Sequence, residues 1–158
     1  MGNNKSHFRG RYDYTADAKG RVNIPAKFRK SLNPEAGETF VICRGPGKCL
    51  RVYPQDVWNT YEDELASRPQ TPETLRHRRL LYNTLTDSVL DAQGRITLTA
   101  AQMTQSSIAK NVTLVGQNEY IEIWDTDTFG TYVDSGDDFD EMFFQSVEAG
   151  LRKPTVPN

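Results

Sequence analysis

The residues best suited to chemistry lie in two short segments that share the pattern Asp-Ala-x-Gly-Arg. One runs from Asp17 to Arg21 and the other from Asp91 to Arg95. A turn that presents backbone N–H groups beside a guanidinium forms a local anion site, because arginine can bind a phosphate or a guanine edge with two hydrogen bonds. We expect Asp17 to orient Arg21, or to tie the turn to its own backbone through an Asx turn. A purely structural salt bridge within the loop explains this spacing equally well.

The two segments belong to a longer internal repeat. Residues 17–26 align with residues 91–100, and Asp, Ala, Gly, Arg and the final Ala are identical. Farther along the chain, residues 50–53 align with residues 121–124 at nearly the same offset. Two matched segments in the same order indicate a duplicated unit.

Each unit predicts the same series of elements. An extended segment leads into a turn, where Gly20 or Gly94 can adopt the positive φ that other residues avoid. A strand follows, because apolar residues alternate with polar ones, and then come a short helix, a hairpin and a second helix. We expect Pro25 at the first helical position, and Thr99 as the cap of the equivalent helix. In the first unit the predicted ranges are 8–14 for the extended segment, 22–24 for the strand, 26–32 for the short helix, 40–43 with 50–53 for the hairpin, and a second helix from about 57. In the second unit they are 84–90, 96–98, 100–107, 112–115 with 120–124, and a second helix from about 129.

The helix that follows each hairpin is expected to pack one apolar face on the core. In the first unit this face comprises Val57, Trp58, Tyr61 and Leu65, and in the second it comprises Phe129, Tyr132 and Val133.

The connector between the units begins with polar residues and prolines. Thr71, Pro72 and Glu73 predict the start of a helix that runs to about Leu85. The basic cluster 76–79 on this helix is interpreted as a solvated face, with contact to DNA or to an acidic neighbour left open. Its inward face comprises Leu75, Leu81 and Leu85. Residues 150–158 are expected to form a frayed tail.

Charge is distributed unevenly along the chain. The formal net charge is -2, yet residues 1–30 contain eight Lys and Arg against two Asp. Residues 117–148 contain ten Asp and Glu and no Lys or Arg. One end can therefore attract polyanions while the other repels them, although two solvated faces would give the same pattern.

No pattern for catalysis or metal binding accompanies these features. A nucleophile elbow, a phosphate-binding glycine loop and a His-x-x-x-His spacing are all absent from the sequence. Cys43 and Cys49 bracket a hairpin loop, and we expect them to be free thiols in a reducing compartment. We expect no enzyme activity, no metal and no cofactor. Since the chain has no export signal and no apolar stretch long enough to span a membrane, we expect a cytoplasmic protein.

Several segments together resemble the bacterial MraZ family over about residues 8–133. They are Phe8-Arg9-Gly10, Asp17-Ala18-Lys19-Gly20-Arg21-Val22, Ile24-Pro25-Ala26-Lys27-Phe28-Arg29, Asp91-Ala92-Gln93-Gly94-Arg95-Ile96, Leu114-Val115-Gly116 and Ile121-Glu122-Ile123-Trp124. This resemblance implies an α+β, β-rich fold of two SpoVT-AbrB domains, built as swapped-hairpin β-barrels with short flanking helices. The implied boundaries are 11–56 and 85–128 for the two domains, 57–84 for a helical connector, and 129–158 for a C-terminal helix and tail.

The resemblance also implies a function. It predicts a nucleoid-associated repressor that assembles into a ring-shaped homo-oligomer and binds repeated promoter elements of a division and cell-wall gene cluster. The DNA-contacting arginine of the family falls on Arg21, with Lys19 beside it. The full set of expected DNA contacts is Arg21, Lys19, Arg9, Arg11, Lys27 and Arg95, and the residues expected to shape the loops are Asp17, Gly20, Asp91 and Gly94. Because Gln93 replaces a lysine and Thr99 a proline, we expect the second loop to contribute less.

The expected partners are promoter double-stranded DNA and further copies of the chain, with no membrane and no small-molecule substrate. The alternative is a protein-interaction scaffold or an antitoxin-like protein binder, which would use the acidic segment 117–148.

Overall fold

Two strands, a short helix, a hairpin and a further helix recur in this order in both halves of the chain, as a computed structural model of residues 7–136 and 138–151 describes. The first half contains β1 (Arg11–Thr15), β2 (Arg21–Asn23), α1 (Ala26–Lys30), η1 (Pro34–Ala36), β3 (Thr39–Gly45), β4 (Cys49–Pro54) and α2 (Gln55–Ser67). The second contains α3 (Pro72–Tyr82), β5 (Thr86–Val89), β6 (Arg95–Thr97), α4 (Ala100–Gln105), β7 (Asn111–Gly116), β8 (Ile121–Asp125) and α5 (Thr126–Asp134). A C-terminal helical segment follows, made of α6 (Phe139–Phe143), η2 (Phe144–Glu148) and α7 (Ala149–Leu151).

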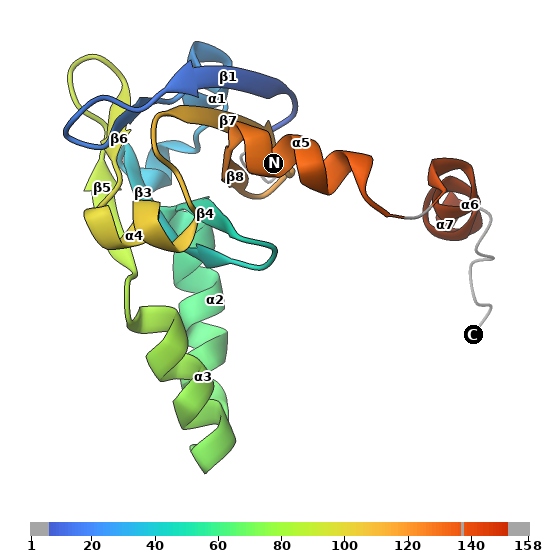
Figure 1. Cartoon of the computed structure of the whole chain (residues 1–158). Helices are drawn as coiled ribbons and strands as arrows, with labels where there is room; N and C mark the ends of the chain where they lie inside the picture. The colour runs from blue at the N-terminus through green and yellow to red at the C-terminus, as the bar shows by residue number, and fades with distance from the viewer. Residues whose placement is uncertain (1–6, 137, 152–158) are drawn as a thin grey trace.

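Strands of the two halves interleave in one antiparallel sheet (Figure 1). Its order is β1-β7-β8-β4-β3-β5, so β1 of the first half pairs with β7 of the second, and β5 of the second pairs with β3 of the first. Replacing each strand by its counterpart in the other half only reverses this order. The sheet therefore has a pseudo-twofold axis between β8 and β4.

A separate two-stranded ribbon, β2–β6, also joins the halves. Val22 and Ile96 lie opposite each other in it, and both side chains are fully buried. Phe28 of α1 is buried as well, and its ring packs edge-on against Phe8 and Tyr12. One hydrophobic core thus holds residues of both halves and fixes the ribbon on the body of the molecule.

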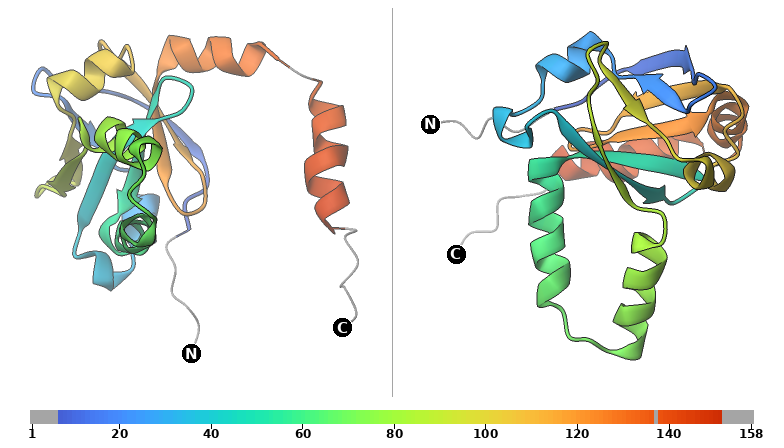
Figure 2. Two further views of the ribbon diagram at one scale, coloured as in Figure 1. Left: turned by 90° about the horizontal axis from the view of Figure 1, so that it is seen from below. Right: turned by 90° about the vertical axis from the view of Figure 1, so that its left-hand side faces the viewer.

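Helices α2 and α3 form a hairpin that projects from the sheet (Figure 2). The predicted cap of α3 is confirmed, because the Thr71 hydroxyl accepts a hydrogen bond from the backbone N–H of Thr74 (3.1 Å). The helix ends at Tyr82 rather than near Leu85. At the base of the hairpin, Trp58 of α2 is buried, and Leu81 packs against the same small cluster.

The packing predicted for α5 is found only in part. Tyr132 and Val133 are 59% and 60% exposed, and α5 contains no buried residue. Phe129 and Tyr132 instead lie with their ring centroids 5.4 and 5.1 Å from that of Trp124. Apolar periodicity predicts which side of a helix packs, but not whether a second layer covers the rest of that side.

Other predictions need smaller changes. Pro25 precedes α1 as its N-cap and is not its first helical residue, whereas Thr99 caps α4 as expected. Gly150 and Leu151 are helical, and the remainder of the predicted tail lies outside the described residues. The α+β class is confirmed, although helices occupy more of residues 7–136 and 138–151 than strands do. Within these ranges, no helix has both the length and the apolar character that crossing a membrane requires.

Candidate nucleic-acid interface

The first Asp-Ala-x-Gly-Arg turn is held by its aspartate. One carboxylate oxygen of Asp17 accepts hydrogen bonds from the backbone N–H groups of Lys19 (3.0 Å) and Arg21 (2.8 Å). The other oxygen accepts one from Nε of Arg21 (2.5 Å). The backbone bond from Arg21 is the largest of several effects that hold the pKa of Asp17 below its usual value. Asp17 thus shapes the loop and orients the arginine at once.

The second turn repeats this arrangement. Asp91 accepts hydrogen bonds from the backbone N–H groups of Gln93 and Arg95, both at 2.9 Å, and from Nε of Arg95 at 2.8 Å. The backbone bond from Arg95 is again the main cause of a lowered pKa, here that of Asp91. In each turn the arginine donates through Nε to the aspartate that shapes the loop.

The β2–β6 ribbon brings the two turns together. Nη1 of Arg95 lies 3.8 Å from the carboxylate of Asp17, so the arginines of both turns flank that single carboxylate. The side chain of Arg95 is 22% exposed and contacts two aspartates, whereas that of Arg21 is 34% exposed and, within the described residues, forms an ion pair with Asp17 alone. The paired turns form one basic surface, on which Arg21 is the more accessible arginine.

Side chains that project outward from the ribbon extend this surface. Arg21 lies opposite Thr97, and Asn23 lies opposite Arg95. Opposed residues of an antiparallel pair share a face, and this face is the reverse of the one that buries Val22. Asn23 and Thr97 are exposed. A two-stranded ribbon fits the DNA major groove, where Arg, Asn and Thr side chains can hydrogen-bond to base edges. Our sequence reasoning missed Asn23 and Thr97, although their alternation with buried residues carried the signal.

The second turn also receives a cation from the other half of the chain. Arg29 of α1 donates from Nε to the carbonyl of Ile24 (3.0 Å), and its guanidinium lies directly over Gly94. A Cβ at Gly94, where φ is +76°, would lie only 2.7 Å from Nε of Arg29. Sequence reasoning did not single out Arg29, because only the interleaved fold places α1 over a turn 65 residues farther along the chain. The second turn has Gln93 at the position of Lys19 in the first turn, so Arg29 supplies a positive charge beside a turn that lacks a lysine of its own.

The remaining predicted contacts divide into two groups. Lys19 is exposed on the first turn, and Lys27 is exposed on α1, the helix that carries Arg29. Arg9 and Arg11 lie at the opposite end of β1 from the first turn. The guanidinium of Arg11 is directed to the ring of Phe129, 5.3 Å from its centroid. The structure therefore places Lys19 on the paired turns and Lys27 on the helix that reaches them, whereas Arg9 and Arg11 lie farther away.

The cysteines are free, as expected, and both are buried. Burial raises the pKa of Cys43 to about 11, and burial together with the Glu122 carboxylate raises that of Cys49 to about 12. Both thiols are protonated at neutral pH, which makes them poor nucleophiles and poor metal ligands. In the described part of the chain, no group of three or more His, Cys, Asp or Glu side chains is arranged to hold a metal ion.

A duplicated α+β body that displays paired arginine turns on one ribbon has the features of an anion-binding protein. Known proteins define this class further. The family described as "MraZ protein, putative antitoxin-like" matches residues 7–79 and 84–149.

Relatives named transcriptional regulator MraZ match most of the chain. The protein from Ligilactobacillus salivarius is 36% identical over 146 residues, which cover 91% of this chain and 99% of the relative. The protein from Nitrosomonas europaea is 37% identical over 135 residues, covering 80% and 91% of the two chains, and that from Halothermothrix orenii is 35% identical over 142 residues, covering 89% and 96%. The chain belongs to the MraZ family, which places it among regulators of transcription and not among enzymes.

Proposed function

We propose that this protein is a sequence-specific DNA-binding regulator, and that the outer face of the β2–β6 ribbon is its DNA-reading surface. The observation that carries this proposal is the convergence of the two arginine turns on Asp17. Two guanidinium groups beside Asn23 and Thr97 combine phosphate-binding charge with side chains that discriminate between bases.

Within this surface the residues have different roles. Arg21 is the principal contact, because it is the more exposed arginine and Lys19 stands beside it. Arg95 contributes less directly, because two carboxylates hold its guanidinium. Arg29 and Lys27 supply positive charge around the second turn, where they meet phosphates. Arg9 and Arg11 are peripheral to the reading surface.

We further propose that the halves are two SpoVT-AbrB units, 11–56 and 85–128, that exchange hairpins. The pairing of strands across the halves, β1 with β7 and β2 with β6, supports this assignment. In this proposal several copies form a ring, and each ribbon meets one promoter repeat of the division and cell-wall gene cluster. The result is repression by a cytoplasmic, nucleoid-associated protein. Several weak contacts held together gain affinity through effective concentration.

Fluorescence anisotropy with a labelled duplex from immediately upstream of the protein's own gene tests the reading surface. Arg21→Ala is expected to weaken binding by about 1–3 kcal/mol, or about 5- to 150-fold, for each engaged ribbon. Arg95→Ala is expected to weaken it less. The matched control is Arg76→Ala, since Arg76 is an exposed arginine on α3, away from the ribbon. A larger loss from Arg95→Ala or Arg76→Ala than from Arg21→Ala would refute the assignment.

A protein-binding role is the second candidate, and the apolar side chains exposed on the acidic C-terminal segment favour it. Stoichiometric binding of one protein, together with no salt-sensitive affinity for DNA, would support this alternative. DNA affinity that falls steeply with rising salt would support the first proposal, because neutralised phosphates release counterions.

A further inference from the structure

The C-terminal helical segment, Phe139–Leu151, exposes apolar side chains that the rest of the molecule does not cover. Figure 1 shows this segment standing apart from the sheet, with α5 leading to it. Phe139 and Phe144 are 65% and 61% exposed, and Met142 and Leu151 are 50% and 82% exposed. Apolar groups gathered in this way on a soluble surface usually mark an interaction site. The segment contains three acidic residues, Asp140, Glu141 and Glu148, and no Lys or Arg.

A groove of the opposite character lies between the sheet and the α2–α3 hairpin. Its volume is about 450 Å³. Aromatic side chains and three arginines line it, and Glu64 is the one acidic residue in its lining. We refer to it as the aromatic groove. The guanidinium of Arg51 stacks over the ring of Tyr120, 4.3 Å from the centroid, and donates to the hydroxyl of Tyr53 (3.1 Å). Nε of Arg51 is buried without a hydrogen-bond acceptor, and the nearest carboxylate, that of Glu122, is 4.0 Å away. The groove therefore offers apolar surface together with positive charge.

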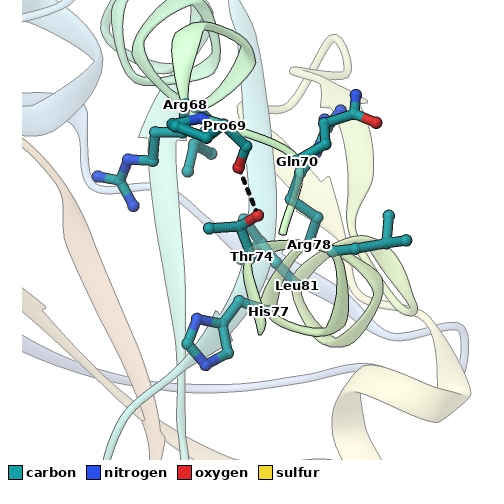
Figure 3. A pocket seen from close by; sticks show the side chains of 9 residues that line it. Arg68, Pro69, Gln70, Thr74, His77, Arg78 and Leu81 are labelled. Atoms are coloured by element: carbon teal, nitrogen blue, oxygen red, sulfur yellow. Dashed lines mark hydrogen bonds between the residues drawn. The ribbon is translucent and has the colours of Figure 1, made fainter. Parts of the chain in front are cut away.

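The aromatic groove continues along the helical hairpin. A smaller pocket of about 70 Å³ between α2 and α3 shares Leu65, Arg68 and Leu81 with the groove. Figure 3 shows this pocket near the tip of the hairpin, where the Thr74 hydroxyl donates to the carbonyl of Pro69 (2.7 Å). Arg78 also lines the pocket, which extends the positive charge. The C-terminal segment spans 13 residues, about 20 Å as a helix, and α2 has the same number of residues.

We propose that the C-terminal segment of one copy docks into the aromatic groove of a neighbouring copy. Phenylalanine side chains would fill the apolar groove, and the acidic residues of the segment would face its arginines. A second copy is the occupant that these observations favour, because the chain carries both complementary surfaces and α5 leads the segment away from its own body (Figures 1 and 2). Such a contact joins two different surfaces, so its repetition closes into a ring when the rotation allows it. The docking of segment into groove is the contact that would hold the proposed oligomer together. Only its consequence for DNA binding rests on the proposed function.

Sedimentation velocity of the full chain without DNA tests this contact. The segment variant is Phe139→Ser with Phe144→Ser, and the groove variant is Arg44→Glu with Arg68→Glu. All four side chains are exposed, so folding is expected to persist, and far-UV circular dichroism checks it. Each variant is expected to need about tenfold or more higher concentration to assemble than the wild type. Val89→Ser, which removes an apolar group that is 64% exposed on β5, is expected to assemble like the wild type.

Mixing the two variants tests the direction of the contact. The groove variant keeps an intact segment and the segment variant keeps an intact groove, so an equimolar mixture is expected to form heterodimers and nothing larger. Docking of the segment on its own chain, or a contact between identical surfaces, predicts no heterodimer. The inference is overturned if the mixture stays monomeric, if either variant assembles like the wild type, or if the wild type itself is monomeric at the highest attainable concentration. Because no DNA is present, none of these results bears on the reading surface, which Arg21→Ala tests separately.

Discussion

The two turn glycines are equivalent in the repeat, yet alanine is expected to have different effects at each. Both have positive φ, +79° at Gly20 and +76° at Gly94, so an alanine at either position pays roughly 1–2 kcal/mol of backbone strain. At Gly20 the new Cβ would lie 2.3 Å from the carbonyl oxygen of Leu98. That backbone is fixed by the hydrogen bond from the Leu98 N–H to the Gly20 carbonyl (2.8 Å), so the ribbon itself must shift.

At Gly94 the obstacle is a side chain. The Cβ would meet the guanidinium of Arg29, which can swing away at the cost of its hydrogen bond to Ile24, about 0.5–1.5 kcal/mol. Gly94→Ala should therefore destabilise the fold by about 1–3 kcal/mol in all, allowing for the lower entropy of the unfolded alanine chain. Gly20→Ala adds overpacking against backbone, about 1–3 kcal/mol beyond the strain, for a total of about 1–4.5 kcal/mol after the same allowance for the unfolded chain.

Urea denaturation followed by tryptophan fluorescence measures both free energies of unfolding. Gly130→Ala is the control, because Gly130 lies in α5 with open space around it, and alanine there should stabilise the helix by about 0.5–1 kcal/mol. Gly94→Ala should also weaken DNA binding at protein concentrations where the fold is intact, since it displaces Arg29. Equal destabilisation by the two turn variants, or a greater effect at Gly94, would refute this account of the turns.

Two further predictions concern pH and the core. Because the pKa values of Asp17 and Asp91 are lowered on folding, their hydrogen bonds contribute stability above the unfolded value near 3.8, and this contribution is lost as the pH falls through the folded values. The difference in melting temperature between the wild type and Asp17→Asn with Asp91→Asn should accordingly be full at pH 6 and shrink below about pH 4, and a difference that is constant down to pH 2 would contradict it. Phe28→Ala should lower the free energy of unfolding by about 3–5 kcal/mol in urea titrations, because Phe28 is fully buried against Phe8 and Tyr12. A loss below about 1 kcal/mol would show that α1 is not anchored through this ring.

The sequence predicted local structure well, because the signals for it are local. Asp17 and Gly20 lie within four residues of the groups that they organise, and Thr71 and Thr99 cap helices that begin immediately after them. The free state of the cysteines followed from their setting in the same way.

Partners that are distant along the chain were not predictable from these signals. Alternation defines β1 as a strand but not its pairing with β7, and without that pairing nothing places Arg29 over Gly94. The exposure of Val133 was missed for a related reason, because an apolar helical face reads the same whether or not another layer covers it.

The central claim is that the outer face of the β2–β6 ribbon lies in the DNA groove, and disulfide crosslinking tests it most directly. Thr97→Cys places an accessible thiol on that face. Cys43 and Cys49 are buried and have pKa values of about 11 and 12, so they are not expected to crosslink. With upstream duplexes that carry a thiol tether on a single base, Thr97→Cys should crosslink at one or a few positions in each repeat. Thr60→Cys, exposed on α2, should not crosslink. Equally fast crosslinking from Thr60→Cys, or none from Thr97→Cys with DNA fully bound, would place the reading surface elsewhere.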